Sequence, residues 1–100
     1  MNITKTENNG QTLLKLEGWL DTAAAPELGK NIEELTSANE IILDFDEVEY
    51  IASSGLRQIV ACHRKAKELN ASFSLINVHN EIMNILKLTG LDKKLDIQEK

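Results

Sequence analysis

Two short strand-like segments that flank one helical stripe place the strongest constraint on how this chain folds. Residues 41–45 (IILDF) form a nearly continuous apolar run, as is typical of a strand covered on both faces, and residues 72–78 (SFSLINV) resemble a second strand. Between them a stripe at helical spacing consists of Leu56, Ile59, Val60, His63 and Ala66. Strand, helix and strand make a βαβ unit, which predicts parallel strands in one sheet.

The segments on either side of this unit extend the same alternation. Residues 2–8 and 12–16 flank Asn9-Gly10, a pair that favours a tight hairpin because both residues tolerate positive φ. A second stripe predicts a helix over about 23–37, with Pro26 in its first turn and Asp21 or Thr22 available as its cap. A third helical face holds Ile82, Ile85 and Leu86, and residues 95–97 form either a last edge strand or the start of a terminal helix.

We therefore predict an α/β fold in a single domain over residues 1–100. Its mixed sheet has four or five strands, opens with an N-terminal antiparallel hairpin and continues in βαβ units, with helices packed against it. The residues expected in the core are Leu43, Phe45, Leu56, Ile59, Val60, Leu75 and Ile85.

Composition argues against several classes of protein. The net charge of −5 and the four aromatic residues argue against a nucleic-acid partner, which needs basic clusters and stacking platforms. Cys62 is the single cysteine, so neither an internal disulfide nor a cysteine-rich zinc site is expected. The N-terminus lacks the apolar run of a secretory signal, and no stretch approaches the roughly 18 apolar residues that span a membrane. We expect a soluble, cytoplasmic protein without membrane insertion.

The residues that could support catalysis do not form a recognisable pattern. Residues 51–55 (IASSG) differ from the Gly-x-Ser-x-Gly elbow of serine hydrolases. His63 and His79 stand where histidines usually pack or cap a helix. The acidic residues in 44–49 are interpreted as solvated loop charges without metal-ligand spacing; they are Asp44, Asp46, Glu47 and Glu49. We expect no enzyme, no catalytic residue, no metal and no cofactor.

The serine pair Ser53-Ser54 permits two interpretations. A serine here can serve as the N-cap of the following helix by accepting a free backbone N–H. The same position suits a phosphoserine, because free N–H groups and the helix dipole favour an anion. Arg57, three residues after Ser54, could reach that phosphate, and Gly55 would let the backbone of another protein approach closely.

The segment from Phe45 to Leu56 (FDEVEYIASSGL) resembles the signature region of STAS domains, in particular of bacterial anti-sigma factor antagonists. In that family a buried strand and a short acidic turn lead through Asp-Ser-Ser-Gly-Leu into a helix. Residues 18–21 (GWLD) and 88–91 (LTGL) resemble two further family motifs in the same order. The resemblance covers nearly the whole chain and implies the fold predicted above.

The resemblance also implies a function. In this family an anti-sigma factor that is a serine kinase phosphorylates the second serine of the motif, which is Ser54 here. The unphosphorylated antagonist binds the kinase and so frees a sigma factor, and phosphorylation breaks the complex. The partner-binding residues implied are Asp21, Thr22, Ser53, Ser54, Gly55, Leu56, Arg57 and Gln58.

One position departs from the family pattern. Ala52 stands where the family has the aspartate before the serine pair, so a negative charge beside the acceptor hydroxyl is missing. The alternative function is therefore a STAS docking subunit of a larger assembly, such as a signalling scaffold or a lipid-transport complex, without a phospho-switch.

Overall fold

The strands and helices follow the predicted order along the chain. The computed structural model describes residues 1–100, which form β1 (Asn2–Asn8), β2 (Gln11–Leu20), α1 (Ala25–Glu33), β3 (Glu40–Ile51), α2 (Ser53–Glu68), β4 (Ser72–Val78), α3 (Asn80–Leu88), the 3-10 helix η1 (Leu91–Lys93) and β5 (Asp96–Glu99). None of the helices is long and apolar enough to cross a membrane.

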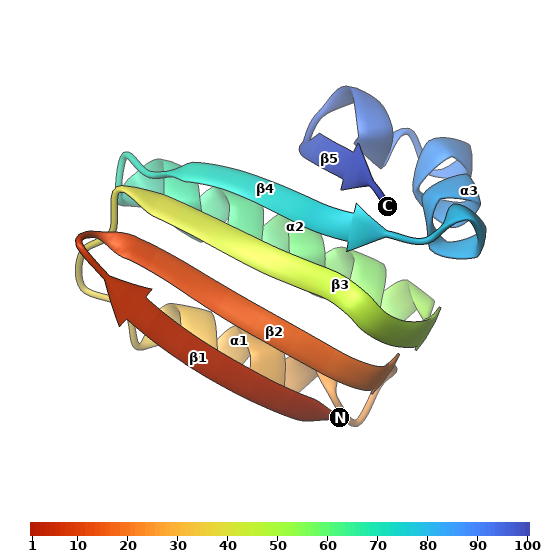
Figure 1. The fold of residues 1–100 in the computed structure, drawn as a ribbon, viewed down its shortest axis with the longest axis horizontal. Coiled ribbons are helices and arrows are strands. Elements are labelled where there is room, and N and C mark those ends of the chain that lie inside the picture. The colour runs from red at the N-terminus through yellow and green to blue at the C-terminus, as the bar shows by residue number, and fades with distance from the viewer.

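The sheet has five strands in the order β1-β2-β3-β4-β5 (Figure 1). The predicted hairpin is confirmed: β1 and β2 are antiparallel, and Asn9 and Gly10 between them have φ angles of 50° and 83°. The remaining neighbours are parallel, so the sheet is mixed, as predicted. Of the two alternatives for the C-terminal segment, the edge strand is the one that forms, because β5 pairs with β4.

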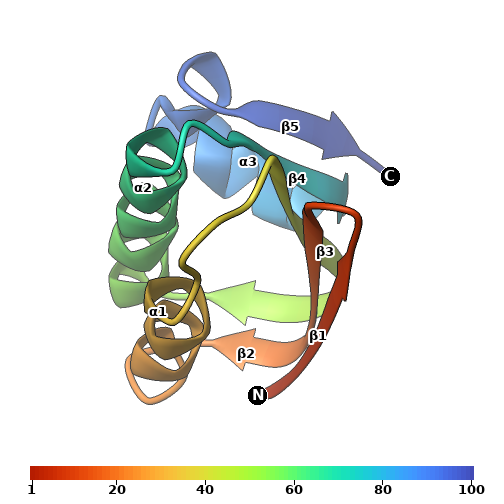
Figure 2. The same ribbon diagram turned by 90° about the vertical axis from the view of Figure 1, so that its left-hand side faces the viewer.

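The helices α1 and α2 lie on one face of the sheet, and the other face is open (Figures 1 and 2). The expectation that residues 41–45 are covered on both faces is therefore wrong. Burial alternates along β3, with Leu43 and Phe45 facing the helices and Ile42 and Asp44 half-exposed on the open face. The acidic segment that was expected to be a turn continues β3 to Ile51, because its charged side chains can point to solvent from a half-open sheet.

The core between the sheet and the helices contains 24 buried residues. Leu43, Phe45, Ile59 and Leu75 are fully buried, as predicted. Leu56 and Ile85 are only partly buried. The prediction for Val60 is wrong, since 38% of its surface is exposed.

The error at Val60 comes from the angular position of the buried stripe on α2. The buried residues of this helix are Gly55, Ile59, Cys62 and Ala66, spaced by three or four positions. Val60 lies one residue, or about 100°, away from Ile59 around the helix and so faces outward. Gly55 and Cys62, which mark the true stripe, are the members that the sequence pattern left out.

Helix α1 is shorter than the predicted span of 23–37. Residues 22–24 form a turn instead, in which the Ala24 N–H donates to Asp21 Oδ1 at 3.0 Å and the Ala25 N–H donates to the Asp21 carbonyl at 2.9 Å. Asp21 therefore fixes the turn that leads into the helix, whose N-cap position is held by Ala24. Pro26 lies in the first turn, as predicted.

Candidate functional site

The candidate site forms where β2 and β3 end side by side. Leu20 is paired with Ile51, and the Ala52 N–H donates to the Leu20 carbonyl at 3.0 Å. Because the two strands are parallel, the segments that follow them emerge at the same end of the sheet, beyond the carboxyl ends of the strands. The Asp21-Thr22 loop and the start of α2 therefore lie together.

A direct contact joins these two segments. The hydroxyl groups of Thr22 and Ser54 lie 3.0 Å apart, within hydrogen-bonding distance. Thr22 and Ser53 are exposed, and Ser54 is half-exposed. The two serines thus stand at the surface, with the Ser54 hydroxyl held in place by a residue from a loop 32 positions away in the chain.

The interpretation of the serines as N-caps is wrong. The N-cap of α2 is Ala52, whose extended backbone (φ −95°, ψ 169°) suits that position but whose side chain accepts no hydrogen bond. Ser53 and Ser54 are the first two residues inside the helix. The family aspartate would therefore stand at the N-cap itself, so Ala52 removes a cap as well as a charge.

The N-terminus of α2 has no acidic residue in its first turn and no side-chain cap. Its backbone N–H groups and the positive end of the helix dipole are consequently uncompensated by any carboxylate of this helix. Arg57 is exposed and takes part in none of the ion pairs of the structure. This end of the helix can therefore accommodate added negative charge on Ser54.

Gly55 has an internal role, which differs from the expectation that it admits the backbone of a partner. It is buried, and a Cβ atom placed on it would lie 2.5 Å from the Leu20 carbonyl oxygen and 3.0 Å from Ile51 Cγ1. The missing side chain lets α2 pack directly on the ends of β2 and β3. Gly55 thus sets the position of the serines relative to the strands.

Two other residues of the predicted partner-binding set also face inward in part. Leu56 packs against the core. Gln58 lies between α1 and α2, where its Nε2 is 3.9 Å from Cys62 Sγ and 2.8 Å from the point where a Cβ on Gly29 would be. Of the predicted set, Thr22, Ser53 and Arg57 are exposed, Asp21, Ser54, Leu56 and Gln58 are intermediate, and Gly55 is buried.

The histidines take part in packing and capping and touch neither serine. His63 stacks on Phe73 with the ring centroids 5.7 Å apart, and burial, followed by the charge of Lys67, lowers its pKa. His79 is the N-cap residue of α3, and its Nε2 lies 2.7 Å from the Asp46 carbonyl oxygen. No group of three or more His, Cys, Asp or Glu side chains is placed to hold a metal ion.

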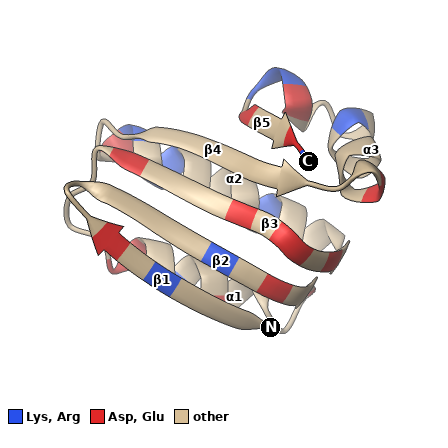
Figure 3. Cartoon of the chain, viewed as in Figure 1, with Lys and Arg blue, Asp and Glu red and all other residues tan.

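The acidic residues of the 44–49 segment lie on a strand and not in the expected loop. The Asp44 carboxylate accepts hydrogen bonds from the Asp46 N–H at 3.0 Å and from Asn77 Nδ2 at 3.1 Å. Lys100 hydrogen-bonds to the Asp46 carboxylate and so lowers its pKa. Figure 3 shows further acidic residues, coloured red, along β2 and β3 toward the end of the sheet where both strands stop.

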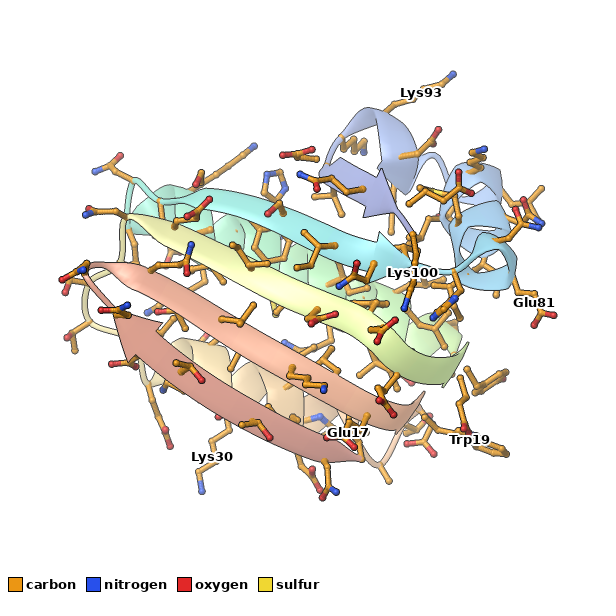
Figure 4. The ribbon with its side chains drawn as sticks, in the orientation of Figure 1. Glu17, Trp19, Lys30, Glu81, Lys93 and Lys100 are labelled. Carbon is orange, nitrogen blue, oxygen red and sulfur yellow. The ribbon has the colours of Figure 1, made fainter.

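An exposed aromatic pair near the carboxyl ends of β2 and β3 was not predicted from the sequence. Trp19 on β2 and Tyr50 on β3 are paired in register, with ring centroids 5.3 Å apart and 57% and 46% of their surfaces exposed. Figure 4 shows Trp19 pointing into solvent from the end of β2. The available signal was that two of the four aromatic residues lie within the two motifs, Trp19 in residues 18–21 and Tyr50 in the segment from Phe45 to Leu56.

Comparison with known proteins agrees with this architecture. The sequence profile described as the STAS domain matches residues 2–100. The chain is 24% identical to the anti-sigma-B factor antagonist of Bacillus subtilis over 101 aligned residues, covering 100% of this chain and 93% of that protein.

Two solved structures share the fold. An anti-sigma factor antagonist from Mycobacterium paratuberculosis has a TM-score of 0.86 at 23% identity, covering 99% of this chain and 86% of the other. The Bacillus cell fate determinant SpoIIAA in its phosphorylated form has a TM-score of 0.76 at 17% identity, covering 96% and 90%. The predicted mixed α/β sheet is therefore confirmed by comparison as well as by the strand order.

Proposed function

Since the chain belongs to the STAS domain family, we propose that it is an anti-sigma factor antagonist regulated by phosphorylation. The unphosphorylated form binds an anti-sigma factor that is a serine kinase, and so frees a sigma factor. Phosphorylation of Ser54 breaks this complex. The name of the Bacillus subtilis relative supports the first part of the proposal. In this proposal the chain is the substrate of the kinase and performs no catalysis itself.

The observation that carries the proposal is the environment of the Ser54 hydroxyl. Its one hydrogen-bond partner is the exposed Thr22 hydroxyl at 3.0 Å, so a kinase can reach it without disturbing the core. A phosphate on Ser54 would meet the uncapped N-terminus of α2, which favours an anion. The fold should therefore tolerate the modification.

The same phosphate would weaken the complex for an electrostatic reason. It adds about −1.5 to −2 charges near neutral pH. Directly after transfer it lies beside the terminal phosphate of the ADP that remains in the kinase, and two anions in a desolvated interface repel each other strongly. Binding should thus fall while the domain stays folded, as a reversible switch requires.

The proposed contact surface consists of the exposed and half-exposed part of the predicted set. Thr22, Ser53 and Arg57 project into solvent around Ser54. Asp21 and Gly55 contribute by holding the loop and the helix in place. Leu56 and Gln58 complete the helix surface from partly buried positions.

The proposal is tested by incubating the protein with a candidate anti-sigma kinase and ATP and by locating the phosphate with mass spectrometry. We expect modification of Ser54 only. Ser54→Asp should lose binding, Ser54→Ala should bind but resist release by ATP, and the control Ser53→Ala should behave like the wild type. Phosphate on another residue, or kinase binding that Ser54→Asp leaves unchanged, would refute the switch.

One observation favours a second candidate, in which the domain only docks onto a larger assembly. Ala52 leaves α2 without the cap that the family aspartate would provide, which alters the setting of the acceptor serine. A docking subunit should bind scaffold or transporter subunits with equal affinity as wild type and as Ser54→Asp. Affinity measurements on this pair of proteins separate the two functions.

A further inference from the structure

The Trp19–Tyr50 pair is an exposed apolar feature that the fold does not use. Both rings stand at the ends of their strands with about half of their surfaces in water, while the next residues along the strands, Leu20 and Ile51, are buried in the core. Trp and Tyr are the side chains most enriched where protein interfaces concentrate their affinity.

This pair adjoins the Ser54 site through the sheet itself. Trp19 precedes Asp21 by two residues, and the register places Leu20 and Ile51, the residues after the pair, directly before the site. Leu20 and Ile51 point toward the helices. The two rings belong to the preceding residue of each strand, so they project from the opposite face of the sheet, at the same ends of β2 and β3. A partner that covers Ser54 from the helix side can reach the rings by extending over the ends of β2 and β3.

The charged side chains that flank the rings along β2 and β3 are acidic. Glu17 and Glu47 are direct neighbours across β2 and β3, and like charges in such a pair repel each other. Glu49 precedes Tyr50 and is exposed. None of these three carboxylates takes part in an ion pair. Figure 3 shows these acidic residues in red toward the ends of β2 and β3, and Figure 4 labels Glu17 on the face of the sheet and Trp19 at the end of β2.

We infer that Trp19 and Tyr50 anchor the proposed kinase partner, by entering an apolar recess that is rimmed with lysine or arginine. This inference rests on the proposed function and adds a second contact to it. Charge complementarity selects this occupant over a second copy of the chain, because a copy would bring carboxylates against carboxylates in a protein of net charge −5.

The anchor and the switch have separate tasks in this arrangement. The aromatic pair adjoins the site but makes no contact with the Ser54 hydroxyl, whose one partner is Thr22, so it binds the kinase equally before and during phosphoryl transfer. Its loss should therefore raise KM for phosphorylation of Ser54 and leave kcat unchanged. A role for Trp19 in positioning the serine would instead lower kcat.

The experiment uses a purified anti-sigma kinase that phosphorylates wild-type Ser54. Trp19→Ala and Tyr50→Ala are each expected to weaken binding by about thirtyfold, the loss that defines a hot spot. Leu13→Ala is the matched control: it removes a half-exposed apolar side chain near the other end of β2, and it should change binding by less than about twofold. Glu47→Lys should also weaken binding, and the wild-type affinity should fall with added salt.

A second measurement needs no substitution, because Trp19 is the only tryptophan of the chain. Protein labelled with 5-fluorotryptophan gives one fluorine NMR resonance. When the kinase binds, this resonance should shift and should no longer be broadened by a soluble paramagnetic reagent. A kinase that binds all variants equally and leaves the resonance unchanged overturns the anchor while the proposed function stands. Self-association through the rings, seen by sedimentation, also overturns the anchor alone. A wild-type chain that no anti-sigma kinase binds or phosphorylates overturns both the anchor and the proposed function.

Discussion

The uncapped start of α2 predicts that Ala52→Asp stabilises the protein. Ala52 already has the extended backbone of an N-cap residue, so an aspartate there can accept the N–H of Ser54 or Gly55 without rearrangement. Replacing a good cap by alanine costs about 0.5–2 kcal/mol in other proteins, and the substitution here runs in the opposite direction.

The expected gain is about 1 kcal/mol, the middle of that range. The helix has no acid in its first turn, so an aspartate at position 52 can still gain the favourable interaction with the helix dipole. The carboxylate of Asp21, in the adjoining loop, would repel the new charge and reduce the gain. For a domain of 100 residues this gain raises Tm by about 4–8 °C. A capping aspartate has a lowered pKa in the folded state. Its charge contribution is therefore present above the unfolded pKa of about 3.9 and is lost as the pH falls through the folded value.

Urea unfolding at pH 7 and at pH 3, followed by circular dichroism, tests this reasoning. Ala52→Asn is the matched control, since it supplies the hydrogen bond without the charge and should stabilise equally at both pH values. Ser53→Asp adds the charge at the first helical position without cap geometry and should gain less. An Ala52→Asp protein that is no more stable than the wild type at pH 7 would refute the reasoning.

Three further predictions concern the residues that hold the site in place. Ile59→Ala should lower the free energy of unfolding by about 2–5 kcal/mol, because Ile59 is fully buried; a loss below about 0.5 kcal/mol in urea titrations would contradict its place in the core. Gly55→Ala should cost about 1–3 kcal/mol despite the better helix propensity of alanine, since the added Cβ would lie 2.5 Å from a backbone oxygen; an unchanged Tm would disprove this. Burial raises the pKa of Cys62 to about 12, so the folded protein at pH 8 should leave Ellman's reagent unreacted until urea exposes the thiol, and rapid release of the chromophore without urea would argue against this.

The features that the sequence predicts correctly depend either on a local pattern or on the topology of the sheet. Asn9-Gly10 has a backbone preference that fixes a hairpin wherever two strands flank it. The meeting of Thr22 with Ser54 follows from topology, because loops after parallel strands gather at one edge of the sheet. Neither inference needs any knowledge of side-chain packing.

The features that were missed depend on how neighbouring elements fit together. The exposure of Trp19 results from a register shift between Gly18 and Trp19, and the residue types at these positions do not predict such a shift. The outward direction of Val60 is decided by Gly55, whose close contact with Leu20 sets the rotation of α2. The length of β3 depends on the open face of the sheet, where its charged residues remain solvated.

The strand order of the sheet has a consequence for synthesis of the protein on the ribosome. Because β1 to β5 are neighbours in the order in which they are made, each new strand adds to a free edge of the sheet that already exists. No finished pairing has to open to admit a later strand, and domains grow from the N-terminus at about 5–20 residues per second. Thr22 and Ser54 both leave the ribosome before β4, so the nascent chain holds both residues of the proposed phosphoacceptor site before its sheet is complete.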